Sequence, residues 1–363
     1  MGSLITHEIR KQFTVFMLVG IVISLAIAIS LLSTVSGRIE SVSVEQNGNS
    51  ELYNYTGKEI IEFNKKQAEM YSGRVMDDAF FDELDVQRKA AASYDEYAIE
   101  ASSLMHFYGH FTMGEGINGK AGDYPMEADL LFGDDKIIYE YTDTWSNALT
   151  ILSNYHIIVA LFAVVMAALS FSKEYSSGMT PIILTTKNGR RVFALGKISA
   201  FYIVMTAVYI FLNVFVIAST HILWGAANPF ADARLIVPSA YSAFGSSVSC
   251  IQIILLQMLI GYSVMLALSA IAIFISSKIK SPYIALAVSV IVMYIPMFIP
   301  RPSSFEVLKV VNLLPVRALG LISNWGHYDY GNRVMIVLAG SAVLIAAVFI
   351  TLAVRSYSRH KAA

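Results

Sequence analysis

Six stretches of the chain are apolar and contain no Asp, Glu, Lys or Arg. A helix needs about 20 mainly apolar residues to cross the hydrocarbon core of a bilayer. The apolar centres are residues 13–34, 152–171, 199–222, 251–275, 281–300 and 334–354. The pattern therefore predicts an all-α polytopic membrane protein with six transmembrane helices.

Residues 1–34 combine a short polar segment with the first apolar stretch. The apolar core is longer than the roughly 7–15 residues of a signal peptide, so we interpret it as a membrane anchor. In the segment before it, one helical stripe is apolar and the rest is polar. The apolar stripe comprises Ile5, Ile9, Phe13 and Phe16, and the polar positions are His7, Glu8, Arg10 and Lys11. This spacing favours an amphipathic helix on the inner membrane surface; the alternative is a basic flank that only orients the first span.

Charged residues are segregated between the two sides of this layout. With the N-terminus inside, the inner segments hold 12 of the 26 Lys and Arg residues but only two acids, Glu8 and Glu174. Short loops rich in Lys and Arg are typical of the cytoplasmic side of a membrane. We therefore expect a multi-pass protein with both termini in the cytoplasm.

Residues 35–150 form one long segment that this layout places outside. It contains 22 acidic and 9 basic residues and is long enough for a domain of its own. Apolar spacing over 58–70 and 77–105 predicts a mainly helical domain, and residues 134–141 alternate as one strand would. We interpret the acidity as a solvated surface. Residues 151–363 then hold the remaining five spans.

Aromatic residues and histidines mark the outer ends of the predicted spans. All three tryptophans, Trp145, Trp224 and Trp325, fall there, as an aromatic belt would place them. His156 and His221 also lie near these ends. We interpret both histidines as interfacial packing residues rather than as chemical groups.

The composition argues against chemistry carried out by this chain. It is 56% hydrophobic and 15% charged, with a mean hydropathy of +0.58 and a single cysteine, Cys250. One cysteine excludes a disulfide framework. No HExxH or GxSxG motif occurs, and residues 189–198 miss the spacing of a phosphate-binding loop. Spans without acidic or basic residues also count against an ion-driven carrier. We expect no enzyme and no directly bound cofactor or metal, with energy supplied by a partner.

Residues 172–198 form a basic inner loop between the second and third spans. Thr180 can cap a short helix that has Pro181 at its first position, and Asn188-Gly189 would end that helix with a turn. The apolar face of this helix comprises Ile182, Ile183 and Leu184. Glu174 stands at the membrane boundary, where an unpaired carboxylate costs desolvation energy, so we expect it to be hydrogen-bonded or paired. The alternative is an ordinary positively charged loop.

This loop resembles the corresponding loop in permeases of ABC-2 type exporters. The shared features are a glutamate after span two, a glycine four residues later, a short apolar helix, an arginine turn and a Gly-Lys pair that opens span three. The matching residues are Glu174, Gly178, Ile182 to Leu184, Arg190 and Gly196-Lys197. The six-span layout, the N-terminal helix and the outside insertion are also similar. By the same resemblance, residues 301–333 contain an outer re-entrant segment.

The resemblance implies a permease subunit of an ATP-driven exporter in a bacterial plasma membrane. Two permease chains, identical or different, would enclose the pathway, and a separate nucleotide-binding ATPase subunit would bind ATP and Mg. The implied ATPase-coupling residues are Glu174, Gly178, Pro181, Ile182, Ile183, Leu184, Arg190 and Arg191, and those of the N-terminal interfacial helix are Ile5, Ile9, Arg10 and Lys11. Membrane lipid is a further expected partner, and nucleic acid is not.

Four polar residues lie within the predicted spans. They are Asn213, Gln252, Gln257 and Tyr262. Each would be costly facing lipid, so each either packs between helices or lines a pathway.

Two other function classes fit the sequence. An ATPase-coupled sensor or immunity protein would use residues 35–150 to bind a peptide or lipid without transport, and the acidity would favour a cationic ligand. A structural or channel-like protein would have no ATPase, and its 172–198 loop would be dispensable.

Overall fold

The computed structural model of this chain describes most of the apolar segments and part of the rest. The described residues are 2–12, 15–36, 40–46, 49–55, 137–176, 189–236, 248–299, 314–320 and 334–359, with residues 311 and 322 and scattered positions between 62 and 86.

Five described helices are long and apolar enough to cross a membrane. They are α2 (Val15–Ser36), α7 (Asp143–Ser176), α9 (Gly189–Trp224), α11 (Cys250–Lys278) and α15 (Val334–Ser358). The chain is therefore a multi-pass membrane protein. Helix α7 begins eight residues before the predicted boundary at 151, so its first turns lie within the segment assigned to the outside domain.

The predicted fifth span forms a shorter helix. Helix α12 (Pro282–Phe298) has 17 residues and reaches about 25 Å at about 1.5 Å per residue, less than the roughly 30 Å of a hydrocarbon core. Pro282 at its first turn is compatible with a helix start, and Pro296 lies in its last turn, where the chain stops being helical. A set of six spanning helices is therefore not confirmed.

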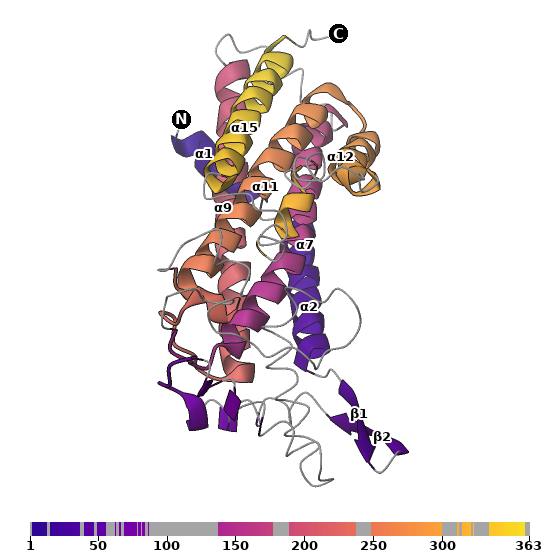
Figure 1. The fold of residues 1–363 in the computed structure, drawn as a ribbon. Coiled ribbons are helices and arrows are strands. Elements are labelled where there is room, and N and C mark those ends of the chain that lie inside the picture. The colour runs from indigo at the N-terminus through magenta and orange to yellow at the C-terminus, as the bar shows by residue number, and fades with distance from the viewer. Residues whose placement is uncertain are drawn as a thin grey trace.

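Helices α7 and α11 form the centre of the bundle. They pack against each other, α15 packs on α11, and α12 packs on α7. Both are apolar on all sides, which is the pattern of a helix enclosed by others. Helices α2 and α15 lie at the periphery and expose large apolar side chains such as Val22 and Leu344, as lipid-facing helices do. The ribbon shows this elongated arrangement (Figure 1).

The two ends of the bundle differ. Both chain termini lie at one end, together with the end of α7 and the start of α9, and we call this the termini end (Figure 1). Strands β1 (Glu40–Gln46) and β2 (Asn49–Tyr55) lie at the opposite end, which we call the hairpin end. The charge pattern predicts that the termini end is the inner side and that the hairpin end is the outer side.

The N-terminal segment forms a separate helix, α1 (Gly2–Gln12), that packs along α9. Ile5 and Ile9 are partly buried while Arg10 and Lys11 are exposed, as the amphipathic pattern predicts. Glu8 differs from the prediction that it faces away from the packed side, because it is 1% exposed. Its burial has an electrostatic cause, described below.

The expected mainly helical outside domain begins with a hairpin instead. Strands β1 and β2 pair antiparallel, with Glu40 opposite Tyr55 and Gln46 opposite Asn49. Asn47-Gly48 stands between the two strands in the sequence, and Asn-Gly between alternating segments is a strong hairpin signal that the prediction of a mainly helical domain overlooked. The scattered described positions between 62 and 71 and between 79 and 86 are helical, as predicted.

A small core joins two distant parts of the segment 35–150. Its buried side chains are Tyr71, Met76, Phe80, Ile137 and Tyr139. The expected strand over 134–141 contributes one bridge, between Val75 and Ile138. Arg74 stacks over Tyr71 and Phe80 and bonds Glu83 at 2.7 Å, and this hydrogen bond lowers the pKa of the Glu83 carboxyl. Residues 87–136, which include the rest of the predicted helix and the acidic run, lie outside the described residues.

Two of the three tryptophans do not form an aromatic belt. Trp145 and Trp224 lie at the hairpin end, but their side chains are only 4% and 3% exposed. Trp145 Nε1 donates to the Asn228 carbonyl over 3.1 Å, and its ring packs edge-on against His221. These rings therefore close the end of the bundle rather than meet the membrane interface. Trp325 lies outside the described residues.

A buried segment near the end of α12 packs against α7 and α11. This η4 segment, residues 314–320 and 322, contains the short helix η4 (Arg317–Gly320) and the buried side chains of Val316, Leu319 and Ile322. Arg317 Nε donates to the Pro296 carbonyl over 2.7 Å, and its terminal nitrogen donates to the Ile299 carbonyl. A cation thus satisfies carbonyls at a helix C-terminus that has no further turn to bond them.

We predict that replacing Arg317 with Met destabilises the protein by about 1–3 kcal/mol, because the α12 carbonyls lose charged donors. Arg317→Lys should restore part of this, since an ammonium keeps the charge without the planar fork. The control is Arg355→Met, which removes an exposed arginine from the last turn of α15. Unfolding by SDS in mixed micelles measures all three; an Arg317→Met loss no larger than that of Arg355→Met would contradict the capping role.

Candidate functional site

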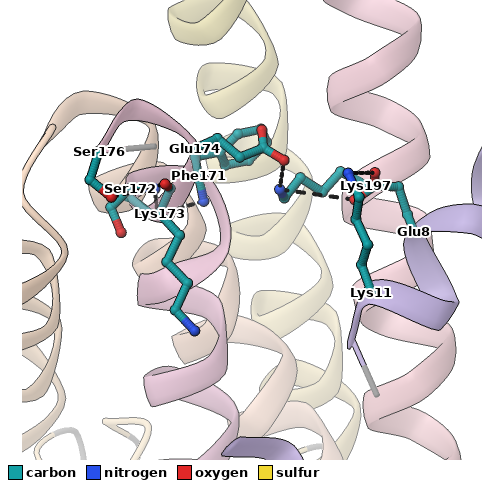
Figure 2. Close-up of polar contacts among 9 residues, drawn as sticks. Glu8, Lys11, Phe171, Ser172, Lys173, Glu174, Ser176 and Lys197 are labelled. Carbon is teal, nitrogen blue, oxygen red and sulfur yellow. Dashed lines mark hydrogen bonds and ion pairs between the residues drawn. The ribbon is translucent and has the colours of Figure 1, made fainter. Parts of the chain in front are cut away.

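Four charged side chains from three helices meet at the termini end. Lys197 of α9 bonds Glu174 of α7, and its Nζ lies 3.9 Å from Glu8 Oε2 of α1. Lys11 Nζ bonds Glu8 Oε1 at 3.1 Å. Figure 2 shows the Lys197 ammonium between the two carboxylates, with Glu174 on one side and Glu8 on the other. We call these four residues the ion cluster.

Three members of the ion cluster, Lys197, Glu8 and Glu174, are largely buried, and the composition of the cluster explains how this is tolerated. Lys197 and Glu8 are 5% and 1% exposed. An isolated charge in such a place would be strongly destabilising, whereas two acids and two bases compensate one another. The Lys197 ammonium also lies 5.6 Å from the ring centres of Phe171 and Phe193, a cation–π arrangement. The expectation that Glu174 is paired is confirmed.

Gly196 lets α1 approach α9. A Cβ atom at this position would lie 2.8 Å from a methyl carbon of Leu4, closer than real contacts allow. The Gly196-Lys197 pair thus has two physical roles, close packing from the glycine and charge pairing from the lysine. The sequence points to these residues only through the resemblance. The signal for pairing was that the inner segments contain two acids, Glu8 and Glu174, among 12 basic residues.

The end of α7 is also fixed to α11 and α15. The backbone amides of Phe171 and Ser172 both donate to Ser276 Oγ, at 2.9 and 3.0 Å. Tyr175 donates to the Ser277 carbonyl over 3.1 Å. Tyr357 of α15 packs its ring against Phe171 and Tyr175. A displacement of the ion cluster therefore passes directly into three spanning helices.

The loop between α7 and α9 is shorter than predicted. Residues 172–176 continue α7, and residues 189–198 already belong to α9, which begins at the predicted turn glycine, Gly189. Arg191 is exposed in the first turn of α9. The backbone of Arg190 is helical, and its side chain lies outside the described part. The remaining predicted coupling residues, Gly178, Pro181, Ile182, Ile183 and Leu184, lie outside the described residues.

A second polar cluster lies inside the bundle and contains two of the pathway candidates. His156 Nε2 lies 2.8 Å from Asn213 Oδ1 and 3.1 Å from the Tyr209 hydroxyl, and Gln257 Nε2 lies 3.4 Å from His156 Nδ1. His156, Asn213 and Gln257 are all fully enclosed. The prediction of an interfacial His156 is therefore wrong. Its span starts earlier than expected, at Asp143, which moves the histidine inward.

The other two pathway candidates are not part of this group. Tyr262 bonds Thr206 over 3.0 Å and stacks edge-on with Tyr209, beside the cluster. Gln252 is exposed and accepts from the Ser249 amide at 2.9 Å, so it caps the start of α11. Within the described residues, no group of three or more His, Cys, Asp or Glu side chains could hold a metal ion.

We predict that Lys197→Met destabilises the protein by about 3–5 kcal/mol, because two buried carboxylates lose their common cation. Adding Glu174→Gln to that variant should recover part of the loss, since one uncompensated charge is then removed. Lys11→Met is the control, because that lysine is largely exposed and should cost less than about 1 kcal/mol. Equal losses at Lys197 and Lys11 in SDS unfolding would contradict the ion cluster.

Gly261 offers a test of the packing around His156. A Cβ atom there would lie 2.5 Å from His156 Nδ1, so we expect Gly261→Ala to displace the ring and destabilise the protein by about 1–3 kcal/mol. Gly340→Ala is the matched control: no atom would meet its Cβ, and it should stabilise α15 by about 0.5–1 kcal/mol. The change in the free energy of unfolding should therefore have opposite signs in the two variants. A change of the same sign in both would contradict this packing around His156.

No known protein-family model matches this chain, and no curated protein matches its sequence.

Proposed function

We propose that this chain is the membrane-spanning permease subunit of an ATP-driven exporter, with a separate ATPase subunit docked at the termini end. The observation that carries the proposal is the ion cluster. It joins α1 to the last turn of α7 and to the first turns of α9, the two helices that flank residues 177–188 in the sequence. A partner that contacts this loop and α1 acts on a single mechanical unit.

The surface around the ion cluster supports docking of a charged partner. Exposed basic residues collect on the helix ends at the termini end. They are Arg10, Lys11, Lys173, Arg191, Lys278, Lys280 and Arg355. Such a surface fits the cytoplasmic side of a membrane and an acidic groove on a soluble subunit. By contrast, the outer segment between residues 35 and 150 is strongly acidic.

The packing indicates how a push at this end would move the bundle. Helix α7 runs from the termini end to the hairpin end and is packed against α11 along the way (Figure 1). Tilting of α1 and the α7–α9 loop after ATP binding in the partner therefore tilts α7 and α11 together. In this mechanism the partner binds ATP and Mg, and the permease supplies the pathway, formed with a second permease chain.

The direct test is to purify the tagged chain from its native membrane in mild detergent and to identify its companions. We predict a stoichiometric companion subunit that carries a phosphate-binding loop and hydrolyses ATP. A chain that is stable and folded without such a subunit at every salt concentration would contradict the proposal. If the complete complex hydrolyses ATP in sealed vesicles but no substrate accumulates, a sensor function would be favoured.

Charge reversal gives a sharper test of the docking surface. We predict that Arg191→Glu lowers the amount of co-purified ATPase about tenfold or more, because like charges then face each other across the contact. The folded yield of the permease should not change, since this side chain is exposed. Lys66→Glu, an exposed basic residue in the outside segment, is the control. Equal recovery of ATPase with both variants would place the contact elsewhere.

A further inference from the structure

The hydrogen bonds around His156 fix which ring nitrogen carries the proton. Asn213 donates from Nδ2 to the Tyr209 carbonyl over 2.8 Å, which leaves its Oδ1 as an acceptor. That oxygen lies 2.8 Å from His156 Nε2, so Nε2 is the donor. The ring is therefore the neutral form with a proton on Nε2 and a lone pair on Nδ1.

Gln257 bonds both to this lone pair and to the η4 segment. Its Nε2 lies 3.4 Å from His156 Nδ1 and 3.0 Å from the Leu319 carbonyl oxygen, so each amide hydrogen has an acceptor. Its Oε1 is buried and has no hydrogen-bond partner among the residues that the structure describes. The bond that holds Leu319 thus depends on an amide orientation in which His156 Nδ1 accepts a hydrogen.

A proton on Nδ1 would reverse this preference. Nδ1 would become a donor facing another donor, whereas the unpaired oxygen of Gln257 is the acceptor it requires. Rotation of the Gln257 amide brings Oε1 to the new N–H and carries Nε2 away. The same rotation turns Oε1 toward the Leu319 carbonyl, and two acceptors cannot bond. One proton therefore reverses the direction of the His156–Gln257 bond, so that Nδ1 donates to Oε1, and removes the Gln257–Leu319 bond.

We propose that His156 is a proton-binding site and that its protonation releases the η4 segment from α11. The resting state leaves one buried acceptor unpaired, an arrangement that costs free energy and that few buried amides show. The protonated state pairs this acceptor but breaks the bond between Gln257 Nε2 and the Leu319 carbonyl, and the loss of that bond is what frees the segment. The site thus uses a buried titratable group that packing alone does not explain, and it stands independently of any ATPase.

Among the described side chains around the His156 ring, Gln257 is the acceptor available to a protonated Nδ1. The titratable groups in the middle of the elements around it include Tyr155 on α7, Tyr209 on α9, Tyr262 on α11 and Arg317 on η4. The charged residues of α7, α9 and α11 lie toward the ends of those helices, and described α2 has no titratable group. Tyr155 and Tyr209 donate to the Ser24 and Met258 carbonyls. Arg317 is bonded to the end of α12. Among the described residues, no carboxylate bonds the ring, so no ion pair competes with the amide.

Release of the η4 segment can be measured as access to a buried thiol. Val316 is 1% exposed, and the only native cysteine is Cys250. We would introduce Val316→Cys into a Cys250→Ala chain in lipid nanodiscs and follow its reaction with 4,4′-dithiodipyridine. Rates are divided by those of the same chain unfolded in SDS at each pH. We expect a rise of roughly tenfold between about pH 7.5 and about pH 4.5.

Variants separate this site from general acid effects. His156→Gln keeps a neutral side chain, so labelling should stay slow at both pH values. His221→Gln removes the other histidine of the described spans, which is bonded only to its own helix, and should leave the rise intact. A rise that persists in His156→Gln, or no rise in the parent chain, would overturn the proposal.

Gln257→Leu tests the same inference if His156→Gln does not fold. This variant lacks the donor to Leu319, so labelling should be fast at about pH 7.5 and should change little with acid. Size-exclusion chromatography establishes that each chain is folded before labelling. Slow labelling of folded Gln257→Leu at neutral pH would show that this amide does not hold the η4 segment.

Discussion

Lys197 holds together the end of the molecule on which the rest depends. Its ammonium lies between the carboxylates of Glu174 and Glu8, and each of the three residues belongs to a different helix. Because all three are shielded from water, none can lose its partners without a large cost. The position of α1, the end of α7 and the start of α9 are thereby fixed by one cation.

The interior of the bundle satisfies its polar groups in the same manner, with hydrogen bonds replacing ion pairs. Asn213, His156 and Gln257 form a chain of contacts from α9 through α7 to α11 and on to the backbone of the η4 segment. Polar groups in a membrane interior must find partners within the protein. Among the described residues, Gln257 Oε1 is one of a few buried side-chain oxygens without a hydrogen-bond partner, and in the proposed switch it accepts a hydrogen bond from the proton that His156 Nδ1 gains.

The sequence predicted the helical, membrane-spanning character because apolar runs longer than about 20 residues have few other uses. It also predicted the amphipathic α1 and the paired Glu174, since an unpaired carboxylate at that depth is costly.

It did not reveal that Glu8 is buried, because a three-residue spacing to Lys11 is compatible with an exposed pair. Nor did it place His156 correctly, since the start of α7 inside a polar stretch shifts the whole span. The sequence also did not reveal that Arg317 bonds the carbonyls at the end of α12, because Arg317 lies about 20 residues further along the chain. The Asn47-Gly48 pair could have predicted the hairpin from local sequence. It was overlooked because the prediction for residues 35–150 was based on the helical spacing over 58–70 and 77–105.

The central claim is that α1 and the α7–α9 loop together receive an ATPase subunit. The most direct measurement places a photoreactive amino acid at His7, an exposed position on α1, and illuminates native membranes before solubilisation. The account predicts a crosslinked product that contains a polypeptide with a phosphate-binding loop, and predicts its loss when Lys197→Met detaches α1. Crosslinks only to lipid or to a second copy of this chain would contradict it.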